Sequence, residues 1–184
     1  MLSANLSKIL NLALYQIGWF CCVLGAAGNY SLAGAGIALL LIAIHLLLAD
    51  NREAELTLVL LTTLYGVLLD SLQQAAGLLL FKSDPRWPFW MPLWVFIIWA
   101  QFATLFRYAL NWLGGQYLLG ALFGFFGGPL AYWSGVRLGA AEFGRIPLLS
   151  LGILAVVWSL SVPLLLRLRQ MGSFKEGRYR IPRR

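Results

Sequence analysis

One carboxylate lies in the middle of a long apolar segment and is the residue of this sequence best placed to do chemistry. Asp70 is the only charged residue between positions 56 and 81. Burying a carboxylate in the hydrocarbon of a bilayer costs a few kcal/mol, so such a residue faces the interior of a helix bundle or a water-filled cavity. There Asp70 could exchange a proton or bind the polar group of a ligand. The alternative is a packing role, with Gln73, Gln74 or a neighbouring helix holding the carboxylate.

The residues around Asp70 place it on one face of an expected helix. Polar and small residues recur there at helical spacing, in steps of four, three, four, four, three and four: Glu55, Val59, Thr62, Gly66, Asp70, Gln73 and Gly77. Glu55 and Asp70 are separated by about 22 Å of helix rise, so they cannot form a paired-carboxylate site. We expect Asp70 to be the catalytic residue, deep in the membrane, and Glu55 to lie near the cytoplasmic surface.

Further polar side chains could complete a pocket around Asp70. If the segment 89–110 is helical, five residues in it and just after it fall on one face that covers roughly a third of the helix circumference: Trp94, Gln101, Thr104, Tyr108 and Asn111. A cationic partner for Asp70 would be Arg107, Arg137 or Lys82. Either of the two arginines could anchor a head group. The expected substrate-binding residues are Gln73, Gln74, Gln101, Arg107, Tyr132, Arg137 and Glu55.

The composition indicates that a membrane surrounds these residues. Apolar residues make up 60% of the 184 residues and charged residues 11%, whereas a soluble domain has roughly 25% charged residues, so a soluble globule is excluded. Several charge-free runs reach the length of about 20 residues that a helix needs to cross a bilayer. We predict an all-α integral membrane protein, a single polytopic domain over 1–184 in a compact bundle of about six transmembrane helices, near 9–28, 32–49, 56–81, 89–110, 117–136 and 147–166.

Three features divide the chain between and within these spans. The polar run Asn29-Tyr30-Ser31 interrupts the first apolar stretch and predicts a tight hairpin. The segment 137–145 is either an interfacial helix or an extension of the fifth span. Within that span, small residues at a spacing of four predict close helix packing, and the proline that follows predicts a kink or break: Gly120, Gly124, Gly128 and Pro129.

Basic residues predict the orientation. The net charge is +7, and the segment 167–184 carries half of the 14 Lys and Arg. The positive-inside rule places this short basic tail in the cytoplasm, and an even number of spans puts the N-terminus there too. Following a membrane span, the tail predicts contact with anionic phospholipid of the bilayer and no nucleic-acid partner. The bases outside the tail favour neither side, and the oligomeric state stays open.

The sequence contains no motif that is typical of a metal or cofactor site. Cys21 and Cys22 are adjacent in an apolar run, and His45 is the single histidine, so a zinc ligand set is not formed. Residues of metal-ligand type surround one loop without the spacing of a metal motif: His45, Asp50, Glu53 and Glu55. The sequence also lacks the nucleophile-elbow motif of serine hydrolases, the phosphate-binding loop of nucleotide hydrolases and the glycine-rich motif of dinucleotide-binding proteins. We predict no metal site and no cofactor.

Three stretches together indicate a family. They are Asn11-Leu-Ala-Leu-Tyr-Gln-Ile-Gly-Trp19, the run from Glu53-Ala-Glu55 to Leu69-Asp70-Ser71, and Gly127-Gly-Pro129-Leu-Ala-Tyr132-Trp-Ser-Gly135 with Leu138-Gly139-Ala140. In these stretches the chain resembles the small bacterial inner-membrane proteins grouped as domain of unknown function 2878, over nearly its whole length. The resemblance implies a multi-pass protein of the bacterial inner membrane. It implies no particular activity, because none is assigned to the family.

The sequence leaves three functions open. In the first, an internal polar pocket around Asp70 binds or acts on a lipid-like, membrane-soluble substrate. In the second, the protein is a small transporter in which Asp70 titrates and a break at Pro129 serves as a gate. In the third, it is a non-catalytic scaffold whose Gly120, Gly124 and Gly128 face docks a partner helix. Whether the protein is an enzyme is not decided.

Overall fold

The computed structural model describes residues 4–171, in which six α-helices account for nearly all regular structure. The helical class is thereby confirmed, with one addition: two strands of three residues each. In chain order the elements are α1 (Ala4–Ala27), α2 (Ser31–Leu48), α3 (Arg52–Ala75), β1 (Leu79–Phe81), α4 (Leu93–Leu105), the 3-10 helix η1 (Asn111–Leu113), α5 (Tyr117–Arg137), β2 (Ala141–Phe143) and α6 (Pro147–Met171). The predicted tail begins within α6, and its remainder, 172–184, lies outside the described residues.

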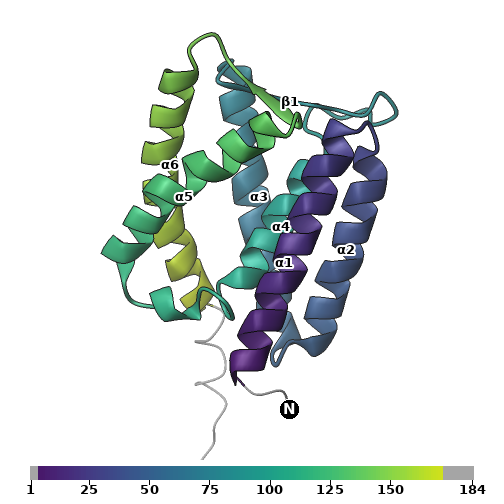
Figure 1. The fold of residues 1–184 in the computed structure, drawn as a ribbon. Coiled ribbons are helices and arrows are strands. Elements are labelled where there is room, and N and C mark those ends of the chain that lie inside the picture. The colour runs from purple at the N-terminus through teal and green to yellow at the C-terminus, as the bar shows by residue number, and fades with distance from the viewer. Residues whose placement is uncertain (1–3, 172–184) are drawn as a thin grey trace, which may run out of the picture.

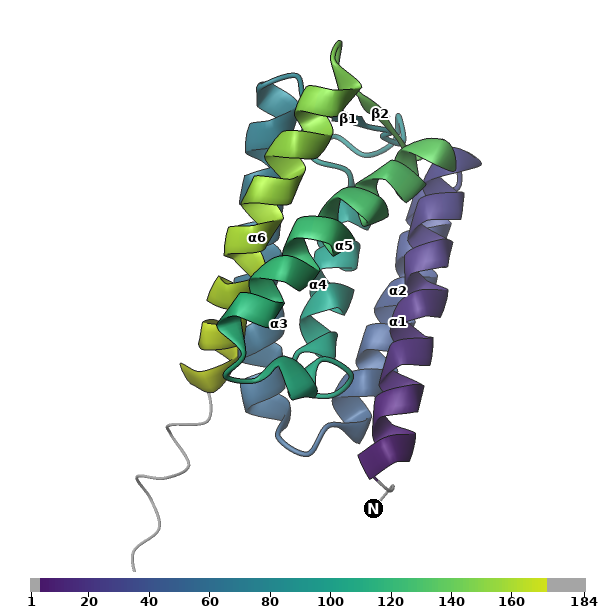
Figure 2. The same cartoon turned by 60° about the vertical axis from the view of Figure 1, so that its left-hand side comes forward.

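The helices form two outer pairs with a third pair between them. Figure 1 shows α1 beside α2 on one flank, α5 beside α6 on the other, and α3 and α4 in between. Figure 2 shows that α5 crosses this assembly obliquely. The start of α1 and the end of α6 lie at one end of the bundle, and β1 and β2 lie at the opposite end. This arrangement agrees with an even number of chain crossings.

The predicted hairpin between the first two segments is confirmed. Helix α1 ends at Ala27 and α2 begins at Ser31. Asn29 between them has a φ of 66°, in the left-handed region that asparagine tolerates better than most residues. Gly34 allows the two helices to approach, because a Cβ atom there would overlap the backbone carbonyl of Cys21. The adjacent cysteines are therefore packing residues of this hairpin, and both are free thiols.

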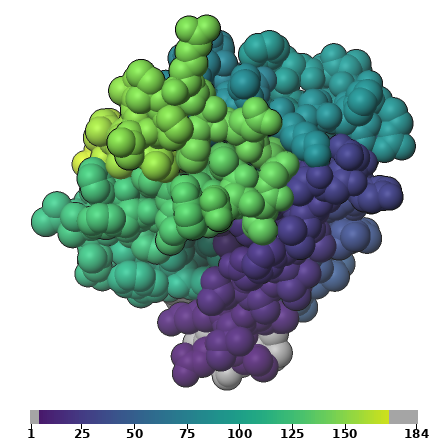
Figure 3. All heavy atoms as spheres, turned by 45° about the horizontal axis from the view of Figure 1, so that its top comes forward, coloured from purple at the N-terminus to yellow at the C-terminus, as the bar shows by residue number. Residues whose placement is uncertain are grey.

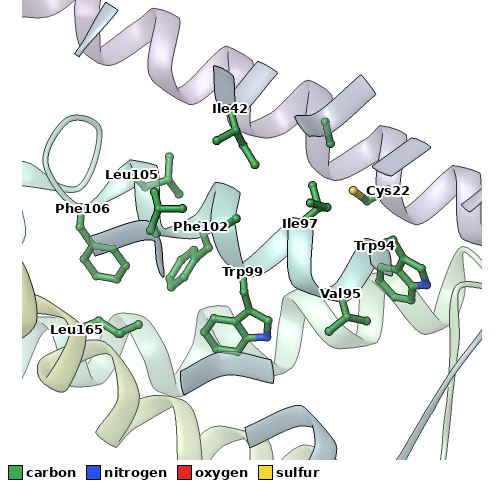
Figure 4. Close-up of a cluster of buried hydrophobic side chains, with 14 of the residues drawn as sticks. Cys22, Ile42, Trp94, Val95, Ile97, Trp99, Phe102, Leu105, Phe106 and Leu165 are labelled. Carbon is green, nitrogen blue, oxygen red and sulfur yellow. The ribbon is translucent and has the colours of Figure 1, made fainter. Parts of the chain in front are cut away.

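Helix α4 is shorter than the predicted span 89–110. Its 13 residues rise about 20 Å, less than the roughly 30 Å of a bilayer core. Pro92 precedes it in an extended conformation (ψ 144°), and turns replace the helix after Leu105. Helix α4 is buried on nearly all sides, and the predicted face with Trp94, Gln101 and Thr104 is buried together with its apolar residues. Figure 4 shows Ile97 on its side toward α1 and α2, and Trp99 and Phe102 on its side toward α6.

The two strands replace helix that the sequence favoured. Helix α3 ends at Ala75 rather than near Phe81, because Gly77 adopts a left-handed φ of 68° that turns the chain into β1. The segment 137–145 forms neither an interfacial helix nor an extension of α5, since Gly139 turns the chain at a φ of 87° into β2. The strands pair antiparallel, with Leu79 opposite Phe143. This pairing gives backbone groups at the end of the bundle hydrogen-bond partners.

The outer surface is that of a protein in contact with lipid. Four helical segments are long and apolar enough to cross a membrane: Asn5–Ala27, Ser31–Leu48, Arg52–Ala75 and Pro147–Gln170. Helix α3 shows the pattern most clearly, because its polar face is buried while large leucines opposite are exposed by 55 to 67% of their surface: Leu60, Leu64, Leu68 and Leu72. A continuous apolar surface of this kind indicates a membrane environment.

The small residues of α5 pack against α6 of the same chain. A Cβ at Gly120 would meet Leu166, and one at Gly124 would overlap the backbone carbonyl of Trp158. The predicted packing role is confirmed, but the scaffold hypothesis is wrong for this face, because α6 already covers it. Helix α5 also runs without a break through Pro129, so the predicted gate has no broken helix to act through.

We predict that Gly124→Ala destabilises the fold and that Gly152→Ala does not. The added methyl group at Gly124 collides with α6 backbone, and overpacking of this kind costs about 1–3 kcal/mol. Gly152 lies in the exposed part of α6, where a Cβ meets no atom within 4 Å. Thermal unfolding of the two variants in detergent compares them, and equal transition temperatures would contradict the close α5–α6 contact.

Candidate functional site

Asp70 lies on the buried face of α3, as its spacing predicted. Glu55, Val59, Thr62, Gly66, Asp70 and Gln73 are all buried along this face. Only 2% of the surface of Asp70 is exposed. Gly77, the last residue of the predicted face, lies beyond the helix and is exposed.

Three donors from three helices hold the Asp70 carboxylate. On one oxygen, Oδ1 accepts from the Tyr132 hydroxyl of α5 at 2.6 Å and from Gln73 Nε2 of α3 at 3.1 Å. The other oxygen, Oδ2, accepts from Trp99 Nε1 of α4 at 2.7 Å. The carboxylate therefore ties α3 to both α4 and α5. Gln73 and Tyr132 are thus brought together with Asp70, as the sequence predicted.

Indole packing fixes the position of the Trp99 donor. Trp99 stacks on Trp158 of α6, with ring centroids 5.0 Å apart and an interplanar angle of 12°. Gly66, one turn before Asp70, leaves the space that the Trp99 ring occupies, because a Cβ there would overlap the ring. Gly66 on the predicted polar face therefore makes room for the Trp99 ring, whose N–H donates to Asp70 on the same face.

Asp70 has no basic partner in the part of the chain that the structure describes. Three ion pairs occur among residues 4–171, and none includes Asp70: His45–Glu55, Arg107–Glu55 and Arg86–Asp84. The hypothesis of a cationic partner is wrong for each candidate. Arg107 pairs with Glu55 at 3.4 Å, Lys82 Nζ donates to the Ala27 carbonyl at 2.6 Å, and Arg137 lies over the Trp133 ring.

A cavity of about 310 Å³ opens beside Asp70, between α1, α4 and α5. Most of its lining is apolar and aromatic, and Asp70 is the only charged residue among the described residues that line it. The aromatic residues of the lining are Tyr15, Trp19, Phe81, Trp94, Trp99, Phe102, Phe123, Tyr132 and Trp158. The expectation of a polar pocket is corrected: the structure has a mostly apolar cavity with one carboxylate in its lining.

An open groove borders this cavity on the surface between α1 and α5. Figure 3 shows the face on which α1 and α5 meet. The groove has a volume of about 490 Å³ and shares four lining residues with the cavity: Tyr15, Trp19, Gly127 and Ala131. Its lining also includes Arg137 near the end of α5.

Four of the predicted site residues lie outside both the cavity and the groove and do not bind Asp70: Gln74, Gln101, Glu55 and Arg107. Gln101 packs between α4 and α1 against Gly18, and it does not line the cavity. Gln74 holds the connection from β1 to α4, since its Oε1 accepts from Phe81 N at 3.0 Å. In that connection Asp84 accepts two hydrogen bonds from the Arg86 side chain, which lower the pKa of the Asp84 carboxyl to about 2.

Glu55 and Arg107 belong to a second buried cluster, at the end of the bundle where α1 begins. Glu55 is 1% exposed; its Oε1 lies 2.8 Å from His45 Nε2 and its Oε2 lies 3.4 Å from Arg107 Nε. Asn11 of α1 lies 3.4 Å from His45 Nδ1 and donates to the Thr104 carbonyl at 3.1 Å. Four segments of the chain thus meet around one carboxylate, which is not part of the Asp70 site.

Sequence reasoning did not single out Trp99, Trp158 or the Asn11 contact. A signal for Trp99 was present, because it lies in the middle of an apolar segment, away from the membrane surfaces where tryptophans usually gather. A buried indole N–H needs an acceptor, and Asp70 was the strongest one available at that depth. Among the described residues, no group of three or more His, Cys, Asp or Glu is placed to hold a metal ion.

Fold and site together define a class: a helical bundle with the apolar surface of a membrane protein and a buried carboxylate in the lining of an apolar cavity. A family model matches residues 8–164, and the chain belongs to this family, described as protein of unknown function DUF2878. Comparison with curated proteins and with solved structures gives no match.

We predict that Glu55→Gln destabilises the protein and that Glu53→Gln does not. Removing the charge of Glu55 leaves Arg107 without its partner in a buried cluster, and breaking such a pair costs about 3 kcal/mol. Glu53 lies two residues earlier on the exposed face of α3. Chemical unfolding of both variants in detergent measures the difference, and an equal effect would show that Glu55 is not a buried structural charge.

Proposed function

We propose that this DUF2878 protein is a multi-pass membrane protein that binds a lipid-like molecule, with the apolar chain in the cavity and the polar end at Asp70. The observation that carries the proposal is the combination of an apolar cavity with one buried carboxylate that has no basic partner in the described chain. Small-molecule sites have this character: a mostly apolar lining and a few placed polar groups.

The size and position of the cavity support this proposal. Its volume of about 310 Å³ falls in the lower part of the range of small-molecule pockets, roughly 300–1,000 Å³. The bordering groove between α1 and α5 connects it to a surface that carries exposed apolar side chains such as Leu12 and Phe123. A membrane-soluble molecule can therefore arrive from the bilayer. Asp70 and Tyr132 are the groups at which a proton could be exchanged with it, and Arg137 could attract its head group on entry.

We further propose that all six helices lie in the inner membrane of a bacterium with both chain ends in the cytoplasm. The start of α1 and the end of α6 lie at the same end of the bundle, which supports placing both chain ends on one side of a membrane. Lys8 lies near the start of α1, Arg52 begins α3, Arg167 and Arg169 lie near the end of α6, and Arg107 donates to the Arg169 carbonyl. The sequence after residue 171 contains five more basic residues. Anionic lipid on the cytoplasmic side is the expected partner of this charge.

Cysteine labelling tests the orientation. In a variant with Cys21 and Cys22 replaced, Ser83→Cys is expected to react with a membrane-impermeant maleimide added to spheroplasts, because the exposed loop before α4 would face the periplasm. Glu53→Cys, exposed at the opposite end, is expected to react only after the membrane is opened. The reverse pattern would overturn the orientation while leaving the fold intact.

Filling the cavity tests ligand binding. We predict that Gly127→Leu lowers the amount of lipid-like molecule that co-purifies with the protein at least about fivefold. Gly127 lines both the cavity and the groove, and an added Cβ meets only the tip of Phe123 at 3.9 Å, so the larger side chain enters open space.

Gly36→Leu in α2 is the matched control, because a Cβ there meets no atom within 4 Å and the position lies outside the cavity. Native mass spectrometry of both variants, released from nanodiscs, gives the occupancy. The proposal is overturned if wild-type protein retains no molecule, or if both variants retain it as well as the wild type does.

A further inference from the structure

We infer that the groove between α1 and α5 is a binding site for an anionic phospholipid of the bilayer, with its phosphate at Arg137 and one acyl chain along the groove. This site is separate from the one proposed at Asp70, because Asp70 does not line the groove and Arg137 does not line the cavity. The inference rests on the shape and charge of the groove and is independent of what binds at Asp70.

The length of the groove matches one leaflet of a bilayer. Its lining on α5 includes Gly127 in the middle of the helix and Arg137 at the helix end. The helix rise between these two residues is about 15 Å, which is half of the roughly 30 Å hydrocarbon core. A groove of this length can hold an acyl chain that runs from the head-group level to the middle of the membrane.

Arg137 is the single charged residue among the described residues that line the groove. It is exposed, and none of the three ion pairs within residues 4–171 includes it. Its Cζ atom lies 5.8 Å from the centroid of the Trp133 ring. A guanidinium that stacks on a ring keeps its N–H edge for other partners, and this edge fits two oxygens of a phosphate group. Arg137 is therefore a phosphate-binding group in an exposed position.

The neighbours of Arg137 place it at the level of the lipid head groups. Helix α5 ends at Arg137, at the end of the bundle where β1 and β2 lie. Trp133, one turn earlier, is exposed, and tryptophans gather where the head groups meet the hydrocarbon. Farther along the groove, the exposed side chains of Leu130 and Phe20 line it from α5 and α1. A cation next to an apolar channel has the same order as the phosphate and acyl chain of a phospholipid.

The lining also favours an anionic over a zwitterionic head group. Phosphatidylcholine and phosphatidylethanolamine carry a cation beside the phosphate, and the described lining contains no Asp or Glu to bind that cation. Phosphatidylglycerol has a phosphate without a cation, so Arg137 attracts it with no opposing repulsion. A chain bound in this way lies against the residues that the groove shares with the cavity, and it borders the opening between α1 and α5: Tyr15, Trp19, Gly127 and Ala131.

Photolabelling tests this inference. Phosphatidylglycerol with a diazirine in one acyl chain is added to full-length protein in nanodiscs, and mass spectrometry of peptides locates the label after illumination. We expect label in 15–20 and 127–138, the segments that line the groove. Arg137→Gln is expected to reduce this label about fivefold, the effect of one basic residue near a membrane surface, and the matching phosphatidylcholine probe should label wild type equally weakly. Arg145→Gln is the control, because Arg145 is also an exposed base just after a strand at this end of the bundle and lies outside the groove.

A second variant tests the position of the acyl chain. Ser134 is partly exposed and lines the groove but not the cavity, so Ser134→Phe fills the groove and keeps Arg137. It is expected to reduce labelling as much as Arg137→Gln does. Because the cavity lining is unchanged, the molecule retained at Asp70 in native mass spectrometry should remain.

Each contrary result overturns a stated part of the inference. Equal labelling by the phosphatidylcholine probe, or full labelling of Arg137→Gln, overturns the assignment of the phosphate to Arg137. Full labelling of Ser134→Phe overturns the position of the chain. If neither segment is labelled in the wild type, the groove is not a phospholipid site.

Discussion

The cost of placing the Asp70 carboxylate in an apolar interior constrains most of this structure. Such a group loses its hydration, and in hydrocarbon each missing hydrogen bond is expensive. The fold meets this cost with donors from three helices, of which Trp99 and Tyr132 come from far along the chain. Both donors need exact placement: Trp99 depends on Gly66 for space and on Trp158 for support. One side chain of α3 thereby fixes how α4, α5 and α6 are arranged around it.

The two buried carboxylates of α3 have different partners. Glu55 is compensated by Arg107 and contacts His45, which leaves its charge paired within the protein. Asp70 receives only neutral donors and borders a cavity. Hydrogen bonds to a charged group contribute roughly 1.5–3 kcal/mol each, and an apolar residue at this position would need none of them. Asp70 therefore differs from Glu55 in having neutral partners and a place in the lining of a cavity.

The sequence predicted what depends on local spacing and left out what depends on contacts between helices. The buried face of α3 follows from the 3.6-residue period, and the hairpin at Asn29 follows from three polar residues in an apolar run. The predicted span 117–136 agrees with α5 to within one residue at its end. The end of α3 and the two strands could not be predicted in this way, because Gly77 and Gly139 turn the chain into paired strands, and each strand is stable only beside the other. The partner of Arg107 could not be predicted either: Glu55 and Asp70 offer the same chemistry, and only the crossing of the helices decides between them.

The cavity follows from the small residues of α5, which the sequence had suggested as a docking face. Gly120, Gly124 and Gly128 draw α5 against the backbone and Trp158 of α6. Because α5 packs chiefly on α6 and crosses the bundle obliquely, it has little direct contact with α1 on its other side. Apolar side chains of α1 and α4 and the glycine-rich face of α5 then enclose space between them, and Tyr132, which also lines that space, donates to Asp70. Close packing on one side of α5 thus produces the opening on the other, and the carboxylate lies where the two meet.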